Sequence, residues 1–174
     1  MAGDIEESIK ALQTAIEIEV NGFETYKRFA EQTEIEAGKK VFNQLANDEV
    51  QHRKILEDQL KKLTAGEQWG EFDIPLSVIE EVAPKISERT AETKGESALG
   101  ELDALNTALD LEKKAMVFFK EQADLTEVPQ AKALFLRLTE WEEAHYDLIK
   151  AEIDNINHTG FYLDMWEFKM DGQY

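Results

Sequence analysis

The feature that most constrains this chain is an internal repeat with a period of 93 residues. Sliding the sequence by 93 positions aligns residues 13–60 with residues 106–153 without a gap, and twelve of these positions are identical. Three of the identities are titratable residues on otherwise apolar helical stripes: Glu19 with Glu112, Glu49 with Glu142, and His52 with His145. The repeat therefore predicts a duplicated structural unit that carries polar residues at matched positions.

Each copy of the repeat contains two stretches with helical periodicity. Apolar residues recur every three or four positions, which is the pattern of a helix with one buried face. The predicted helices cover residues 4–34, 37–64, 97–125 and 129–158. Pro129 suits the first turn of the last helix, because a proline there removes no helical hydrogen bond. Short links within each pair predict two antiparallel hairpins in an all-α four-helix bundle.

Two segments lie outside this pattern. Residues 66–96 contain Gly and Pro and are long enough to carry the chain along a bundle, so we expect a long crossover there. Residues 159–174 include five aromatic residues. We expect this tail to pack on the bundle as a strap, with a partner-binding or dimer segment as the alternative, and we expect His158 to be structural. Residues 1–174 are expected to form one domain.

The composition excludes several classes of function. Acidic residues number 37 and basic residues 19, which gives a net charge of −18. Such a surface repels nucleic acid and anionic membranes and attracts cations. No apolar run approaches the roughly 18 residues of a membrane span, and the N-terminus lacks signal-peptide features, so we expect a cytoplasmic location. The chain has no Cys and therefore holds no thiolate-bound zinc or iron–sulfur cluster.

The polar residues of the repeat are predicted to lie at one level of the bundle. Glu19 and Glu49 are 30 residues apart, and the predicted turn lies midway between them, near Glu34. Since a helix rises about 1.5 Å per residue, both carboxylates stand roughly 20–25 Å from that turn. Glu112 and Glu142 are also 30 residues apart. Each histidine follows its glutamate by one helical turn and shares its face, so we expect all six side chains in one cross-section.

Four inward carboxylates require compensating cations. Burial of one unpaired charge costs several kcal/mol or forces protonation. Two divalent ions would balance the four charges, and oxygen ligands with imidazole suit iron or manganese, with zinc as an alternative. One glutamate on each of two helices, with Glu-x-x-His on each of the other two, is the recurrent di-iron arrangement. A solvated or salt-bridged charge cluster is the remaining alternative. Asp48 and Trp141 are expected to point away from this face.

With Tyr26 seven residues after Glu19, this set resembles the rubrerythrin branch of the ferritin-like di-iron proteins, over residues 4 to about 158. The resemblance implies a ferritin-like bundle with two iron ions per chain. It also implies specific ligand roles: Glu49 and Glu142 would bridge the ions, Glu19 and His52 would hold one, and Glu112 and His145 the other. Tyr26 would hydrogen-bond a ligand carboxylate, with an ordinary core tyrosine as the alternative.

The sequence departs from this family in two ways. Rubrerythrins usually carry a further glutamate three residues after the third-helix ligand, and it exchanges with a histidine as the iron changes oxidation state. Ala115 stands at that position here, and Gly22 at the repeat-related one. Many rubrerythrins also carry a rubredoxin domain, whose Cys-ligated iron this chain lacks. The resemblance therefore implies an external electron donor, such as a rubredoxin-like protein, and families of this kind often form homodimers.

Three functions are compatible with these features. The first is a di-iron oxidoreductase that reduces hydrogen peroxide or dioxygen and protects against oxidative stress, as the resemblance implies. For this function we expect an apolar pocket around Phe23, Tyr26, Met116 and Phe119 that keeps bulk water out. The second is Fe(II) oxidation for iron storage or buffering, which the charge of −18 also fits. The third is a structural or interaction bundle without redox function.

Overall fold

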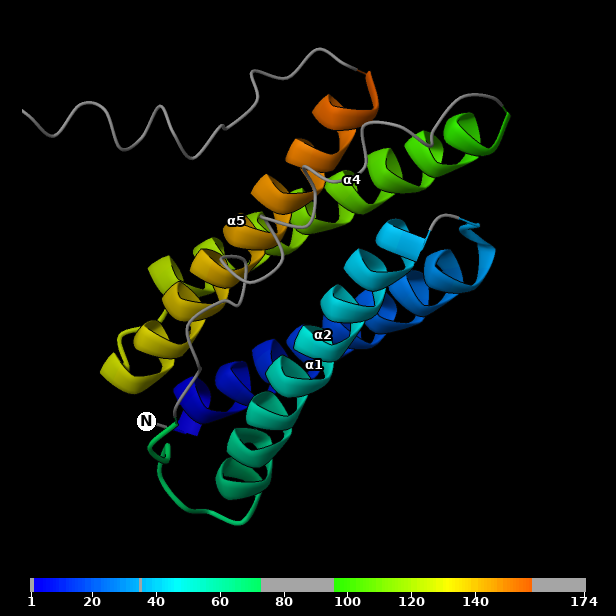
Figure 1. Cartoon of the computed structure of the whole chain (residues 1–174). Helices are drawn as coiled ribbons and strands as arrows, with labels where there is room; N and C mark the ends of the chain where they lie inside the picture. Colours follow the sequence, from blue (N-terminus) through cyan, green and yellow to red (C-terminus); the bar gives the residue numbers. More distant parts are fainter. Residues whose placement is uncertain (1, 35, 73–95, 158–174) are drawn as a thin grey trace, which may run out of the picture.

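The computed structural model describes residues 2–34, 36–72 and 96–157 (Figure 1). The expected tail at 159–174, with His158, lies outside these residues, as does most of the expected crossover at 66–96. The described part contains four helices and no strand: α1 (Ala2–Gln32), α2 (Glu36–Thr64), α4 (Glu96–Leu125) and α5 (Pro129–Asn157). None of these helices is apolar over a stretch long enough to cross a membrane.

The helices pack as two antiparallel hairpins. Figure 1 shows α1 running beside α2 and α4 running beside α5, and the backbones approach most closely within these pairs. Between the hairpins, the most extensive backbone contact is between α1 and α4. The predicted all-α four-helix bundle is confirmed. Each helix end lies within two residues of its predicted position.

Local sequence explains where two of these helices end or begin. After α2, Gly66 adopts a φ of 77°, in the left-handed region that glycine favours, and its N–H donates to the Leu63 carbonyl at 3.1 Å. Pro129 occupies the first position of α5, as predicted. Before it, the Val128 N–H donates to Thr126 Oγ1 at 3.2 Å, which fixes the tight link from α4.

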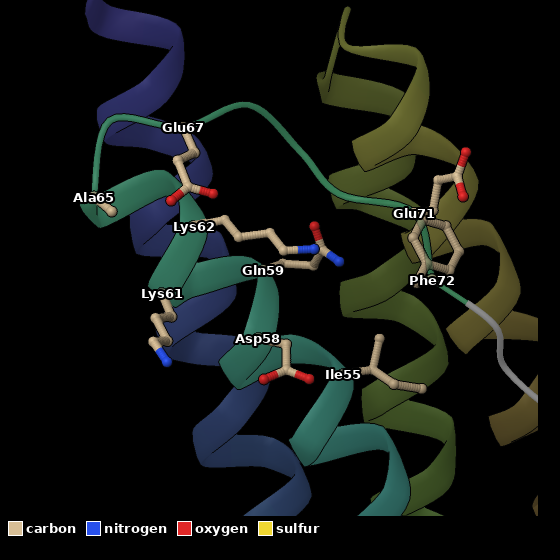
Figure 2. Close-up of a pocket in the computed structure, with 9 residues that line it drawn as sticks. All are labelled: Ile55, Asp58, Gln59, Lys61, Lys62, Ala65, Glu67, Glu71 and Phe72. Atoms are coloured by element: carbon tan, nitrogen blue, oxygen red, sulfur yellow. The ribbon is translucent and has the colours of Figure 1, made fainter.

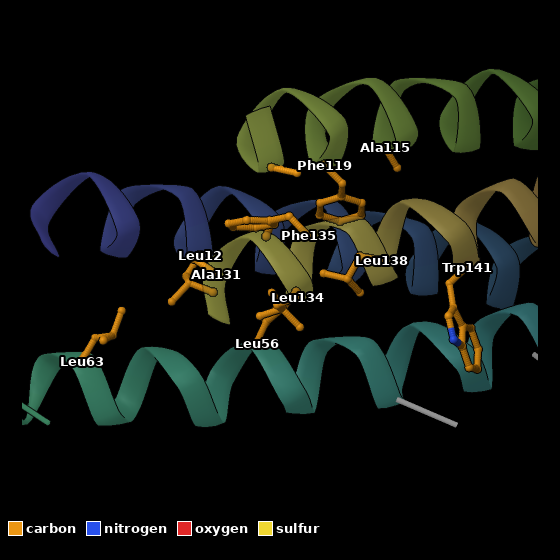
Figure 3. Close-up of a cluster of buried hydrophobic side chains, with 12 residues drawn as sticks. Leu12, Leu56, Leu63, Ala115, Phe119, Ala131, Leu134, Phe135, Leu138 and Trp141 are labelled. Carbon is orange, nitrogen blue, oxygen red and sulfur yellow. The ribbon is translucent and has the colours of Figure 1, made fainter. Parts of the chain in front are cut away.

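The apolar core consists of two layers on either side of a polar level. One layer, shown in Figure 3, includes Leu12, Leu56, Phe119 and Leu134. The other is centred on Phe42, Leu45, Leu105 and Ile149. Along every helix, the repeat's glutamates and histidines fall between residues of the two layers. Each fully buried Leu or Phe contributes about 1.5–3 kcal/mol, so the layers supply the stability that holds polar groups between them.

Candidate metal centre

The six titratable residues of the repeat converge between the two apolar layers. Each of the four helices contributes one glutamate, and α2 and α5 each add a histidine. All six side chains are buried: Glu19, Glu49, His52, Glu112, Glu142 and His145. Their nitrogen and oxygen atoms form two overlapping groups, within each of which one atom per residue lies within 4.8 Å of every other. Glu49 and Glu142 belong to both groups.

One group is arranged around the Nδ1 atom of His52. This atom lies 3.3 Å from Glu19 Oε2 and 3.3 Å from Glu142 Oε1. It lies 3.7 Å from Glu49 Oε2. Three carboxylates from α1, α2 and α5 thus face one imidazole nitrogen, each through a single oxygen.

The second group repeats this arrangement around His145 Nδ1. The distances are 3.3 Å to Glu142 Oε2, 3.4 Å to Glu112 Oε1 and 3.7 Å to Glu49 Oε1. Glu49 and Glu142 therefore each direct one oxygen toward each imidazole. The two imidazole rings lie nearly parallel, with centroids 5.7 Å apart. A carboxylate that faces both groups in this way can bridge two cations.

Asp48 and Trp141 contradict the prediction that they point away from the site, because both are buried. Asp48 Oδ2 lies 3.3 Å from the outer nitrogen of His145, Nε2. Asp48 is itself held by Gln44, whose Nε2 donates to Oδ1 at 3.0 Å. The rings of Trp141 and His52 are nearly perpendicular, at 85°, with centroids 4.4 Å apart. The repeat contained a usable signal, since Asp48 and Trp141 are themselves 93 residues apart.

Tyr26 lies where the sequence placed it, beside a carboxylate of the site. Its buried hydroxyl donates a short hydrogen bond to Glu112 Oε1. Burial, followed by the charge of Glu112, raises the pKa of Tyr26 well above its ordinary value. The hydroxyl therefore stays protonated and orients the Glu112 oxygen.

Burial and mutual repulsion also shift the protonation of the carboxylates. Burial, followed by the nearby Glu142 carboxylate, raises the pKa of Glu112 to about 8. Burial, followed by the Glu19 carboxylate, raises the pKa of Glu49 well above its ordinary range. Although burial opposes it, the two facing imidazoles lower the pKa of Glu142. Protein groups alone do not keep all the carboxylates ionised together.

The pKa values of the two imidazoles shift in the opposite direction to that of an isolated buried histidine. Burial favours the neutral ring, but the facing carboxylates outweigh it and raise the pKa of both, chiefly Glu19 for His52 and Glu112 for His145. A bound cation would reverse this balance, because metal ligation requires a neutral imidazole and a charged carboxylate.

The unsatisfied atoms of the site fit a cation. Glu19 Oε1, Glu142 Oε1 and His145 Nδ1 are buried and have no hydrogen-bond partner among the described residues. Orphaned buried polar atoms normally cost about 1–3 kcal/mol each, and here they are carboxylate oxygens and an imidazole nitrogen of one cluster. A hard or borderline divalent ion accepts this donor set. The cluster could therefore bind metal.

A cavity of about 170 Å³ reaches the carboxylate side of this cluster from between α1 and α4. Its lining consists of five repeat-related pairs and one tyrosine: Ile18 and Leu111, Glu19 and Glu112, Asn21 and Lys114, Gly22 and Ala115, Glu49 and Glu142, and Tyr26. Neither histidine lines it. The pocket expected around Phe23, Tyr26, Met116 and Phe119 is not the one formed, because only Tyr26 of these four lines the cavity.

A larger hollow, of about 580 Å³, lies away from the cluster near the end of α2 (Figure 2). Its lining includes Asp58, Lys62 and Phe72 but none of the six titratable residues of the repeat. Size therefore does not identify the functional site in this bundle. The smaller cavity is the one that meets the buried carboxylates.

Comparison with known proteins identifies the fold and the family of this chain. A structure of a hypothetical protein from Pyrococcus furiosus superposes with a TM-score of 0.66 over 89% of this chain and 93% of that one, at 22% sequence identity, which shows the shared fold. A search of curated protein sequences gave no match. The family model for rubrerythrin matches residues 10–153, which include all six residues of the cluster. The chain therefore belongs to the rubrerythrin family.

Proposed function

We propose that this protein is a non-haem di-iron oxidoreductase that reduces hydrogen peroxide or dioxygen with electrons from an external donor. The observation that carries the proposal is the pair of overlapping ligand groups that share Glu49 and Glu142. Two cations held by shared carboxylates act on one small molecule together. Two ferrous ions, when bound, would supply the two electrons that peroxide reduction requires.

The ligand roles follow from the two groups. Glu49 and Glu142 would bridge the ions, because each directs one oxygen toward each imidazole. The remaining glutamates and histidines would complete the separate positions: Glu19 with His52, and Glu112 with His145. Two divalent ions would bring four positive charges against four carboxylates. Manganese or zinc would satisfy the same donor set.

The residues around the cluster would prepare it for small-molecule chemistry. Tyr26 keeps its proton and holds the Glu112 oxygen through a hydrogen bond. The cavity between α1 and α4 gives access from one side. The apolar layers above and below exclude bulk water from the remaining faces. The sequence has no Cys to hold a second iron centre, and this supports an external source of electrons.

Titration of the reduced, iron-loaded protein with hydrogen peroxide under anaerobic conditions tests this function. We expect two irons per chain and complete oxidation by about one equivalent of peroxide, with little mineral formed. Ferritin-like storage, the main alternative, predicts continued uptake and oxidation of added Fe(II), to hundreds of irons per assembly. A loaded protein that peroxide does not oxidise would overturn the proposal.

A further inference from the structure

The cavity between α1 and α4 is lined by corresponding residues from the two copies of the repeat. Ten of its eleven lining residues form five pairs related by the 93-residue repeat. The pairs Glu19 with Glu112 and Glu49 with Glu142 form one end. Their unpartnered oxygens, Glu19 Oε1 and Glu142 Oε1, are buried. The cavity therefore reaches all four carboxylates of the proposed metal site.

Two small residues provide the space. Gly22 and Ala115 are repeat-related and line the cavity from α1 and α4. A Cβ atom on Gly22 would lie only 3.1 Å from both Cδ and Oε1 of Glu49, so a larger residue there would crowd this glutamate. The side chain of Ala115 is a single methyl group. The alanine leaves the volume free for a ligand.

The size and the walls of the cavity indicate which ligand fits. Its volume of about 170 Å³ exceeds the roughly 150 Å³ of an engineered protein cavity that binds benzene. Ile18, Leu111 and Ala115 give it apolar walls beside the carboxylate end, and Lys114 lies at its exposed edge. Hydrogen peroxide has no apolar part to use these walls. A molecule with an oxygen-donor end and a small alkyl group uses both surfaces.

We propose that this cavity binds small organic hydroperoxides, with the O–O group toward the carboxylate end and the alkyl group against Ile18, Leu111 and Ala115. The inference rests on the proposed function and names its substrate class. Reduction breaks the O–O bond of ROOH and yields ROH and water. It consumes two protons and two electrons, and two ferrous ions, when bound, would supply the electrons and become ferric. The external donor then restores the ferrous state.

Binding of unreactive carboxylates measures the cavity independently of turnover. Formate and pivalate present the same oxygen-donor end, and pivalate adds a tert-butyl group. Their dissociation constants are measured on the oxidised, iron-loaded protein from changes in its near-ultraviolet absorption. We expect the wild type to bind both. Ala115→Leu should raise the Kd of pivalate about tenfold or more, because its side chain occupies the alkyl space, and leave that of formate within about threefold.

A second variant acts in the opposite direction and does not depend on Ala115→Leu folding. Leu111→Ala should enlarge the cavity and tighten binding of benzoate, which is larger than pivalate. Matched controls are Ala133→Leu and Leu136→Ala, at exposed positions of α5. These control variants should change neither the Kd of pivalate nor the Kd of benzoate. Failure of the wild type to bind pivalate, or equal constants in wild type and Leu111→Ala, would overturn the inference.

Oxidation of the reduced protein separates the inference from the function on which it rests. We expect both hydrogen peroxide and tert-butyl hydroperoxide to oxidise the wild type, and Ala115→Leu to slow the reaction with the alkyl hydroperoxide at least tenfold more than the reaction with hydrogen peroxide. Oxidation of the wild type by hydrogen peroxide alone would overturn the inference and leave the proposed function standing. Oxidation by neither, with two irons bound, would overturn the function.

Discussion

Asp48 Oδ2 lies 3.3 Å from Nε2 of His145, so a buried carboxylate on α2 orients an imidazole on α5. The repeat-related residue of Asp48 is Trp141, whose ring lies nearly perpendicular to that of His52. Nε2 of His52 has no hydrogen-bond partner among the described residues. The two halves of the site therefore have the same types of ligand residue. They differ in the second contact of each imidazole, which is a carboxylate for His145 and an indole for His52.

This difference predicts unequal affinities at the two metal positions. A carboxylate behind a ligating imidazole fixes its orientation and raises its basicity, and its loss typically costs about 10–100-fold in metal affinity. Asp48→Asn should therefore weaken one of the two metal positions by about this factor and leave the other nearly unchanged. Titration against a competing chelator measures both constants. Asp58→Asn, at an exposed position of α2, is the control, and equal weakening at both positions would contradict the account.

The contact of Trp141 with His52 predicts an optical signal. A redox-active metal at the nearby imidazole should quench the fluorescence of an indole whose ring centroid lies 4.4 Å from that of the imidazole. Iron loading should therefore reduce the emission of the wild type, and Trp141→Phe should lose most of this change. Trp69→Phe, away from the cluster, should retain it. Equal quenching in the two variants would show that iron binds elsewhere.

The hydrogen bond from Tyr26 to Glu112 predicts a loss of stability in Tyr26→Phe. Removing the hydroxyl leaves a buried carboxylate without its donor, which costs about 1–3 kcal/mol. Denaturant unfolding of the metal-free protein measures this difference. Tyr146→Phe, on the partly buried side of α5, should change the free energy of unfolding much less. A Tyr26→Phe protein as stable as the wild type would mean that the hydrogen bond contributes nothing.

The raised pKa values predict that the metal-free protein loses stability as the pH rises. The pKa of Glu112 is about 8 in the folded protein, against 4.5 for an ordinary glutamate. Between these values the folded protein holds a proton that the unfolded chain has released, so the free energy of unfolding falls with rising pH. The raised imidazole pKa values act in the same direction.

Thermal unfolding of the metal-free protein between pH 5 and pH 8 checks this sign. The Tm of the wild type should fall across the interval. Glu112→Gln, whose amide carries no charge at any pH, should give a flatter profile. A wild-type Tm that rises with pH would contradict the prediction.

The helices and the six inward residues were accessible from the sequence because periodicity and the repeat act on the same positions. An apolar stripe fixes which face of a helix is buried, and the 93-residue spacing fixes which residues share a level. The burial of Asp48 and Trp141 was not predicted, because the apolar stripe covers less of the helix surface than is buried in a bundle. Each helix here contacts more than one neighbour, so residues beside the stripe are also buried.

The cavity could not be predicted from the same patterns. Large apolar residues indicated a pocket around Phe23, Met116 and Phe119, but Phe119 is fully buried and packs on Phe135 with ring centroids 6.4 Å apart. Large side chains fill space, and cavities form where side chains are small. Gly22 and Ala115 line the cavity, but its volume depends on the separation of α1 and α4, which the sequence does not give.

The most direct test of the account is the number of irons bound per chain after anaerobic reconstitution. The wild type should bind two, because two ligand groups share Glu49 and Glu142. Glu49→Ala and Glu142→Ala should each lose at least one iron, whereas Glu143→Ala, at the adjacent exposed position, should keep both. Fewer than one iron in the wild type, or two irons retained in Glu49→Ala and Glu142→Ala, would contradict a di-iron site bridged by these carboxylates.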